Sequence, residues 1–168
     1  SSDVCSSDLQ EFLNDWVIPR LCAGGKAQIK SHQNNGDRVV MTTATNRFIT
    51  ELTAAYLGIQ ELIATEAEIH EGLFTGRTQG VLNMREGKVT RLKAWCNSQN
   101  LQWEQLESWG YSDSINDLPL LEAVTHATVT QGDIKLRAAY DVIKAISKKV
   151  VEKIEKAKAA ARERADTV

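Results

Sequence analysis

The stretch that decides the fold class is VVMTTATNRFITELTAAYLG, residues 39–58. Its first four residues form a short, largely β-branched run, which is typical of a buried strand. Small polar residues follow over 43–46, and an amphipathic helix is predicted over 48–57, ending at Gly58. A strand that leads directly into a helix is the repeating unit of an α/β fold.

The same alternation continues along the chain. A hairpin is predicted within 67–80, with its turn at Glu71-Gly72. The other predicted elements are strands over 61–65, 109–112 and 126–130 and helices over 86–99 and 118–124. We therefore expect an α/β, Rossmann-like core with a mostly parallel sheet. Functional residues should gather just after the strands, at Thr43, Thr65 and Asp113.

The composition excludes several classes of protein. The chain has 168 residues, of which 42% are hydrophobic and 25% charged, and a net charge of -2, which fits one soluble globular domain. No apolar run reaches about 18 residues, so no membrane span is expected. The nearly neutral charge does not favour nucleic-acid binding. Three cysteines without metal-ligand spacing favour free thiols and a cytoplasmic setting, and we expect Cys22 and Cys96 to be buried.

Both ends of the chain differ from this body. Residues 1–9, SSDVCSSDL, have no hydrophobic period; we expect either a disordered terminus or the translation of a short-read sequencing adaptor, whose DNA encodes them in one frame. Residues 10–30 carry apolar side chains at helical spacing, interrupted at Pro19. Residues 134–168 hold 10 Lys or Arg against 5 Asp or Glu, and their apolar positions predict one long basic amphipathic helix. That helix either packs one stripe on the body or binds a partner.

Two segments could bind phosphate or neutralise its charge. The hydroxyl of Thr43 and the backbone N–H groups at the start of the following helix could bind a phosphate, although a threonine before a helix is also a commonplace cap. Lys88 stands at the start of another helix, where a lone lysine is most often a solvated surface group.

A third segment is rich in acidic oxygens. In the turn SDSIND, residues 112–117, Asp113, Asn116 and Asp117 follow a predicted strand, where a Mg²⁺ ion could be held by few protein ligands and several waters. Alternatively, Asp113 is a turn residue and Asp117 a helix N-cap. The residues alone leave both interpretations open.

Four stretches, taken in order, resemble the signature motifs of the haloacid dehalogenase superfamily, and most of all its subfamily IB of phosphoserine-phosphatase-like hydrolases. They are TATNRFIT (43–50), IATEAEIHEGLFTGR (63–77), REGKVTRL (85–92) and YSDSINDLPLLEAV (111–124). The resemblance covers roughly residues 10–138. It implies that 31–133 form the core, that 10–30 are the end of a helical cap, and that most of this cap is missing.

The resemblance also implies roles for single residues. Thr43 would bind the transferring phosphoryl group through its hydroxyl, together with the backbone N–H of Ala44. Lys88 would neutralise charge on the nucleophile and the phosphoryl oxygens. Asp113 would be a Mg²⁺ ligand. Its neighbours Asn116 and Asp117 would complete the metal shell and hold the lysine, with Asn116 also near the phosphate.

The implied function is a Mg²⁺-dependent phosphomonoesterase that acts on a small phosphorylated metabolite, such as phosphoserine or histidinol phosphate, through an aspartyl-phosphate. The family's nucleophile is the first Asp of a DxDx[T/V] motif, and no such motif occurs in the 168 residues. We therefore expect this chain by itself to be inactive and to be a fragment. The alternative is a non-catalytic binding module of the same fold that recruits a partner through the basic helix over 134–168.

Overall fold

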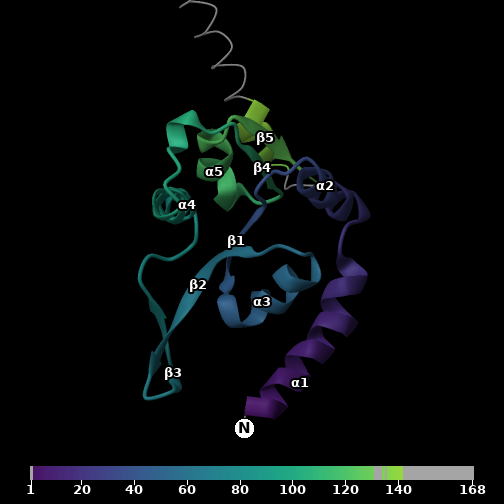
Figure 1. Ribbon diagram of the computed structural model, residues 1–168, viewed down its shortest axis with the longest axis vertical. Helices are drawn as coiled ribbons and strands as arrows, with labels where there is room; N and C mark the ends of the chain where they lie inside the picture. Colours follow the sequence, from purple (N-terminus) through teal and green to yellow (C-terminus); the bar gives the residue numbers. More distant parts are fainter. Residues whose placement is uncertain (1, 131–133, 135, 142–168) are drawn as a thin grey trace, which may run out of the picture. The chain divides into compact units, whose positions relative to one another are not determined.

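The computed structural model describes residues 2–130, 134 and 136–141 (Figure 1). The chain divides into two compact units, Ser1–Gln105 and Leu106–Val168. Each unit is described by itself. In the part of the chain that the structure describes, no helix is long and apolar enough to cross a lipid bilayer.

The first unit is built around a three-stranded sheet with the order β1-β2-β3. Its strands are β1 (Val40–Asn46), β2 (Glu61–His70) and β3 (Leu73–Gln79). β1 and β2 run parallel, and β2 and β3 form the predicted antiparallel hairpin. β1 is longer than the sequence predicts, because its polar end still pairs with β2. β2 joins the predicted strand over 61–65 to the first arm of the predicted hairpin.

Helix α3 (Arg47–Tyr56) connects the two parallel strands and packs against them, as Figure 1 shows. The side chain of Asn46 caps it by accepting a hydrogen bond of 2.9 Å from the Phe48 N–H. The helix ends at Tyr56, with Leu57 as its C-cap, and the next residue, Gly58, has a φ of 67°. Ala54 of α3 and Ile63 and Ala64 of β2 are buried where the helix packs against the sheet. The predicted strand–helix–strand unit is therefore confirmed.

The remaining elements of this unit are helical. They are α1 (Ser2–Phe12), a π-helical turn (Leu13–Val17), a 3₁₀ turn (Ile18–Arg20), α2 (Ala23–Asn34), α4 (Glu86–Ser98) and a 3₁₀ turn (Trp103–Gln105). The predicted interruption at Pro19 is confirmed, since the proline lies in the 3₁₀ turn. α1 includes most of residues 1–9, whose origin stays a prediction.

The second unit contains a parallel pair of strands, β4 (Trp109–Ser112) and β5 (His126–Val129), joined through a 3₁₀ turn (Ile115–Asp117) and α5 (Leu118–Ala123). Leu120 and Leu121 of α5 are buried. Residues 134 and 136–141 are helical, with Leu136 buried. The rest of the long basic helix predicted over 134–168 lies outside the described residues. The predicted α/β fold with parallel strand pairs is confirmed.

Cys22 and Cys96 differ from each other. Cys96 on α4 is buried, as predicted, and this burial raises the pKa of its thiol. Cys22 is exposed, so the prediction that it is buried is wrong. It stands just before α2, where hydrogen bonds from the backbone of Gly25 and Gly24 lower the pKa of its thiol.

Candidate active site

Thr43 lies within β1 and not after it, because Thr43 still pairs with Ala64 of β2. The register then shifts, so that the next pair is Asn46 with Thr65. Ala44 and the residue after it form an exposed bulge between these two pairs. The predicted position of Thr43 and Thr65 just beyond their strands is therefore wrong.

The helix whose first N–H groups are expected to bind phosphate does not include Ala44. α3 begins at Arg47, three residues after Ala44, and its Phe48 N–H is already bound by the side chain of Asn46. The Thr43 hydroxyl accepts a hydrogen bond of 3.1 Å from the Thr45 N–H. The N–H of the exposed Ala44 therefore belongs to the bulge of β1 and not to the N-terminus of α3.

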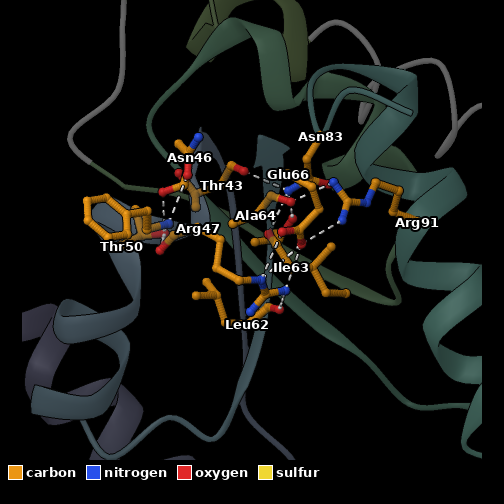
Figure 2. Close-up of polar contacts among 12 residues, drawn as sticks. Thr43, Asn46, Arg47, Thr50, Leu62, Ile63, Ala64, Glu66, Asn83 and Arg91 are labelled. Carbon is orange, nitrogen blue, oxygen red and sulfur yellow. Dashed lines mark hydrogen bonds and ion pairs between the residues drawn. The ribbon is translucent and has the colours of Figure 1, made fainter. Parts of the chain in front are cut away.

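Asn83 joins the two parallel strands β1 and β2, and the sequence alone did not point to it as a site residue. Its side chain is 0% exposed. As Figure 2 shows, it reaches the Thr43 end of β1 from the segment that precedes α4. Its amide nitrogen donates to Thr42 Oγ1 at 2.9 Å, to the Thr43 carbonyl at 2.8 Å and to the Ile63 carbonyl at 2.7 Å. The one available signal is a lone amide within the apolar run Val81-Leu82-Asn83-Met84.

A cluster of two arginines and one glutamate borders the same strand end (Figure 2). Arg47 binds both carboxylate oxygens of Glu66, at 2.9 and 3.1 Å, and Arg91 approaches that carboxylate at 3.4 Å. The same guanidinium groups donate to the carbonyls of Leu62 at 2.8 Å and Ala64 at 2.6 Å. Two positive charges face one negative charge, so the cluster leaves a net positive charge beside β2.

Lys88 is buried, with an exposed fraction of 6%. The common expectation of a solvated surface lysine is therefore wrong. Local packing fixes its backbone, because a Cβ atom at Gly87 would overlap the carbonyl oxygen of Leu82. A fully buried lysine is rare in proteins unless it meets an opposite charge.

The acidic turn of the second unit combines exposed and buried groups. Asp113 and Asn116 are exposed, whereas Asp117 is only 9% exposed. The carboxylate of Asp117 accepts a hydrogen bond of 2.7 Å from the Ser112 hydroxyl. Asp117 does occupy the N-cap position of α5, but its side chain makes no capping hydrogen bond. The N-cap interpretation of this side chain is therefore wrong.

The donor set of this turn fits Mg²⁺. Two carboxylates and one amide oxygen, from Asp113, Asp117 and Asn116, are hard oxygen ligands of the kind that Mg²⁺ prefers, with waters completing its shell. In the ranges that the structure describes, no group of three or more His, Cys, Asp or Glu side chains could hold a metal ion. A metal here would therefore use the amide oxygen or water as well as the two carboxylates.

The predicted site residues are divided between the two units. Thr43, Ala44 and Lys88 belong to the first unit, and Asp113, Asn116 and Asp117 share one turn of the second. The convergence of Thr43, Lys88 and Asp113 at one site stays a prediction.

Comparison with known proteins identifies the family. The family of haloacid dehalogenase-like hydrolases matches residues 1–122. A histidinol-phosphatase from Neisseria meningitidis serogroup C is 35% identical over 132 residues, which are 76% of this chain and 58% of that protein. A phosphoserine phosphatase from Mycobacterium tuberculosis is 28% identical over 77% of this chain and 41% of its own length. The chain thus spans about half the length of these curated relatives.

Solved structures agree with this assignment. A protein of unknown function from Bordetella pertussis Tohama I is 37% identical, with a TM-score of 0.79 over 83% of this chain and 63% of that one. A probable phosphoserine phosphatase from Vibrio cholerae, 16% identical, shares the fold with a TM-score of 0.55 over 66% of this chain and 34% of its own. With its motifs, fold and relatives in agreement, the chain belongs to the haloacid dehalogenase-like hydrolase family.

Proposed function

We propose that the complete protein is a Mg²⁺-dependent phosphomonoesterase that acts on a small phosphorylated metabolite. The observation that carries the proposal is the burial of Lys88 in a chain of this family. Lys88 belongs to the motif-like stretch over 85–92, and its burial fits a role within a site better than that of a solvated surface lysine. The names of two relatives, histidinol-phosphatase and phosphoserine phosphatase, suggest the substrate class.

Each proposed site residue would contribute to the binding or the charge of a phosphoryl group. The Thr43 hydroxyl and the Ala44 N–H would orient its oxygens, and Lys88 would neutralise the charge that develops on them. Asp113, Asn116 and Asp117 would hold Mg²⁺, and Asn116 would also bind phosphate. When bound, the ion would supply further positive charge and orientation.

We further propose that transfer in the complete protein passes through an aspartyl-phosphate. A carboxylate oxygen would attack phosphorus, the ester P–O bond would break, and the leaving alkoxide would take a proton. Water would then hydrolyse the acyl phosphate and return the carboxylate and inorganic phosphate. Because residues 1–168 contain no DxDx[T/V] motif, this chain alone should not turn over p-nitrophenyl phosphate.

The phosphate-binding part of the proposal can be tested on the chain itself. We expect ³¹P NMR with Mg²⁺ present to show binding of inorganic phosphate, with affinity falling by about tenfold or more in Lys88→Met, because a charge-assisted hydrogen bond is lost. Lys93→Met is the matched control, since Lys93 lies on the same helix with a half-exposed side chain. Equal affinity of wild type and Lys88→Met would contradict the proposal and favour the non-catalytic binding module.

The expected inactivity has its own test. Turnover of p-nitrophenyl phosphate by the purified chain, abolished by Asp113→Ala, would show that residues 1–168 suffice for catalysis and would contradict this part of the proposal.

A further inference from the structure

We infer that Asn83 is a positioning residue that orients the peptide group between Thr43 and Ala44 for phosphate binding. This inference rests on the proposed function, because it concerns the same phosphate-binding backbone. It adds a residue that lies outside all four signature-like motifs.

The contacts of Asn83 converge on the point where the β1–β2 ladder becomes irregular. Its amide nitrogen binds the Thr43 carbonyl at 2.8 Å and the Ile63 carbonyl at 2.7 Å, one from each strand (Figure 2). Immediately after Thr43 the register shifts by the bulge that contains Ala44. Asn83 therefore anchors the last regularly paired residue of β1 before the backbone bulges.

Peptide geometry connects this anchor to the proposed phosphate donor. The Thr43 carbonyl and the Ala44 N–H belong to the same planar peptide group, and the peptide is trans. In a trans peptide the C=O and N–H bonds point in opposite directions. Since the carbonyl is directed at the buried Asn83, the N–H of the exposed Ala44 is directed away from it. Without this anchor the peptide could rotate and turn its N–H away from a bound anion.

The orientation of the Asn83 amide is itself fixed. Two carbonyl acceptors require donors, so the NH₂ group must face them. The opposite atom, Oδ1, is the only buried side-chain nitrogen or oxygen in the described residues that has no hydrogen-bond partner. Leaving an acceptor buried in this way is unfavourable, which shows that the contacts of the NH₂ group dominate the conformation.

Asn83 also lies close in sequence to the proposed charge-neutralising lysine. Asn83 precedes Lys88 by five residues. The carbonyl oxygen of the preceding residue, Leu82, lies so close to Gly87 that no Cβ atom would fit there. The segment that leads into α4 therefore orients the phosphate-binding peptide through one side chain and fixes the start of the helix through its backbone.

The inference is tested by titrating the ¹⁵N-labelled chain with inorganic phosphate in the presence of Mg²⁺ while following the Ala44 amide signal. In the wild type we expect this signal to shift on binding. In Asn83→Ala we expect the affinity reported by this signal to fall by about tenfold, the equivalent of one hydrogen bond to an anion. Thr42→Val is the matched control, because it removes the third Asn83 contact and keeps both carbonyl contacts; its affinity should stay within about twofold of the wild type.

The outcomes separate the inference from the proposed function. A folded Asn83→Ala variant that binds phosphate with wild-type affinity would overturn the role of Asn83 alone. A wild-type Ala44 signal that phosphate does not move would overturn the proposed phosphate site, and the inference with it.

A measurement on the wild type covers the case in which Asn83→Ala does not fold. The side-chain ¹⁵N signal of Asn83 should follow the same phosphate saturation curve as the Ala44 amide signal. The reason is that Asn83 donates to the carbonyl of the peptide group whose N–H is that of Ala44. If Ala44 responds to phosphate and the Asn83 side chain does not, the inference is wrong.

Discussion

The end of β1 and the acidic turn of the second unit reach their conformations by different means. Asn83 joins residues that are 20, 40 and 41 positions away in the sequence. In the acidic turn, by contrast, Ser112, Ser114, Asn116 and Asp117 are joined by hydrogen bonds that span only 2 to 5 positions. The first region depends on the tertiary fold, whereas the second is largely specified by its own residues. Damage to the first should therefore spread through its unit, and damage to the second should stay local.

The largest expected effect disturbs the segment that carries Asn83 into the long-range region. Gly87→Ala would place a Cβ atom against the Leu82 carbonyl oxygen, and a backbone atom cannot move aside as a side chain can. We expect urea unfolding to show a loss of about 3 kcal/mol in the free energy of unfolding. The matched control is Gly25→Ala in α2, where the added Cβ would be 3.9 Å from the nearest atom, in Cys22; its effect should be slightly stabilising, by about 0.5 kcal/mol or more. Equal effects of the two substitutions would contradict the packing argument.

A smaller effect is expected from a substitution in the acidic turn. Ser112→Ala removes the 2.7 Å hydrogen bond to the buried Asp117 carboxylate, and a hydrogen bond to a charged group contributes about 2 kcal/mol. We expect amide hydrogen exchange to accelerate in β4 and the acidic turn, with little change in β1 and β2. Ser98→Ala, which removes an exposed hydroxyl bound to its own helix, is the control and should change exchange little. Acceleration in both units after Ser112→Ala would show that the acidic turn is not a local structure.

The same contrast explains what the sequence could predict. Local patterns predict the strand over 109–112, the hairpin turn at Glu71-Gly72 and the helix over 86–99, and the structure places them nearly residue for residue. Each depends on near-neighbour signals such as β-branched runs, glycine turns and helical spacing. Thr43, Lys88 and Asp113 are candidates from the residues alone, each with an ordinary structural alternative, and only the resemblance to a family assigns them specific roles.

Features set by distant partners could not be predicted from local patterns. β1 continues past residue 42 because β2 pairs with its polar end. Lys88 looks like a surface lysine in a helical pattern, and only the fold makes it buried. Asn83 is a single amide in an apolar run, and its partners are up to 41 residues away. Residue patterning carries no signal for such contacts, which depend on the assembled sheet.

The proposed function predicts that the acidic turn of the second unit holds a divalent metal ion through Asp113, Asn116 and Asp117. Paramagnetic Mn²⁺, used in place of Mg²⁺ on the ¹⁵N-labelled chain, tests this most directly, since Mn²⁺ broadens only the amide signals near it. We expect the signals of residues 112–117 to broaden first, at the lowest Mn²⁺ concentrations. Broadening that begins elsewhere and leaves residues 112–117 sharp would contradict the proposal.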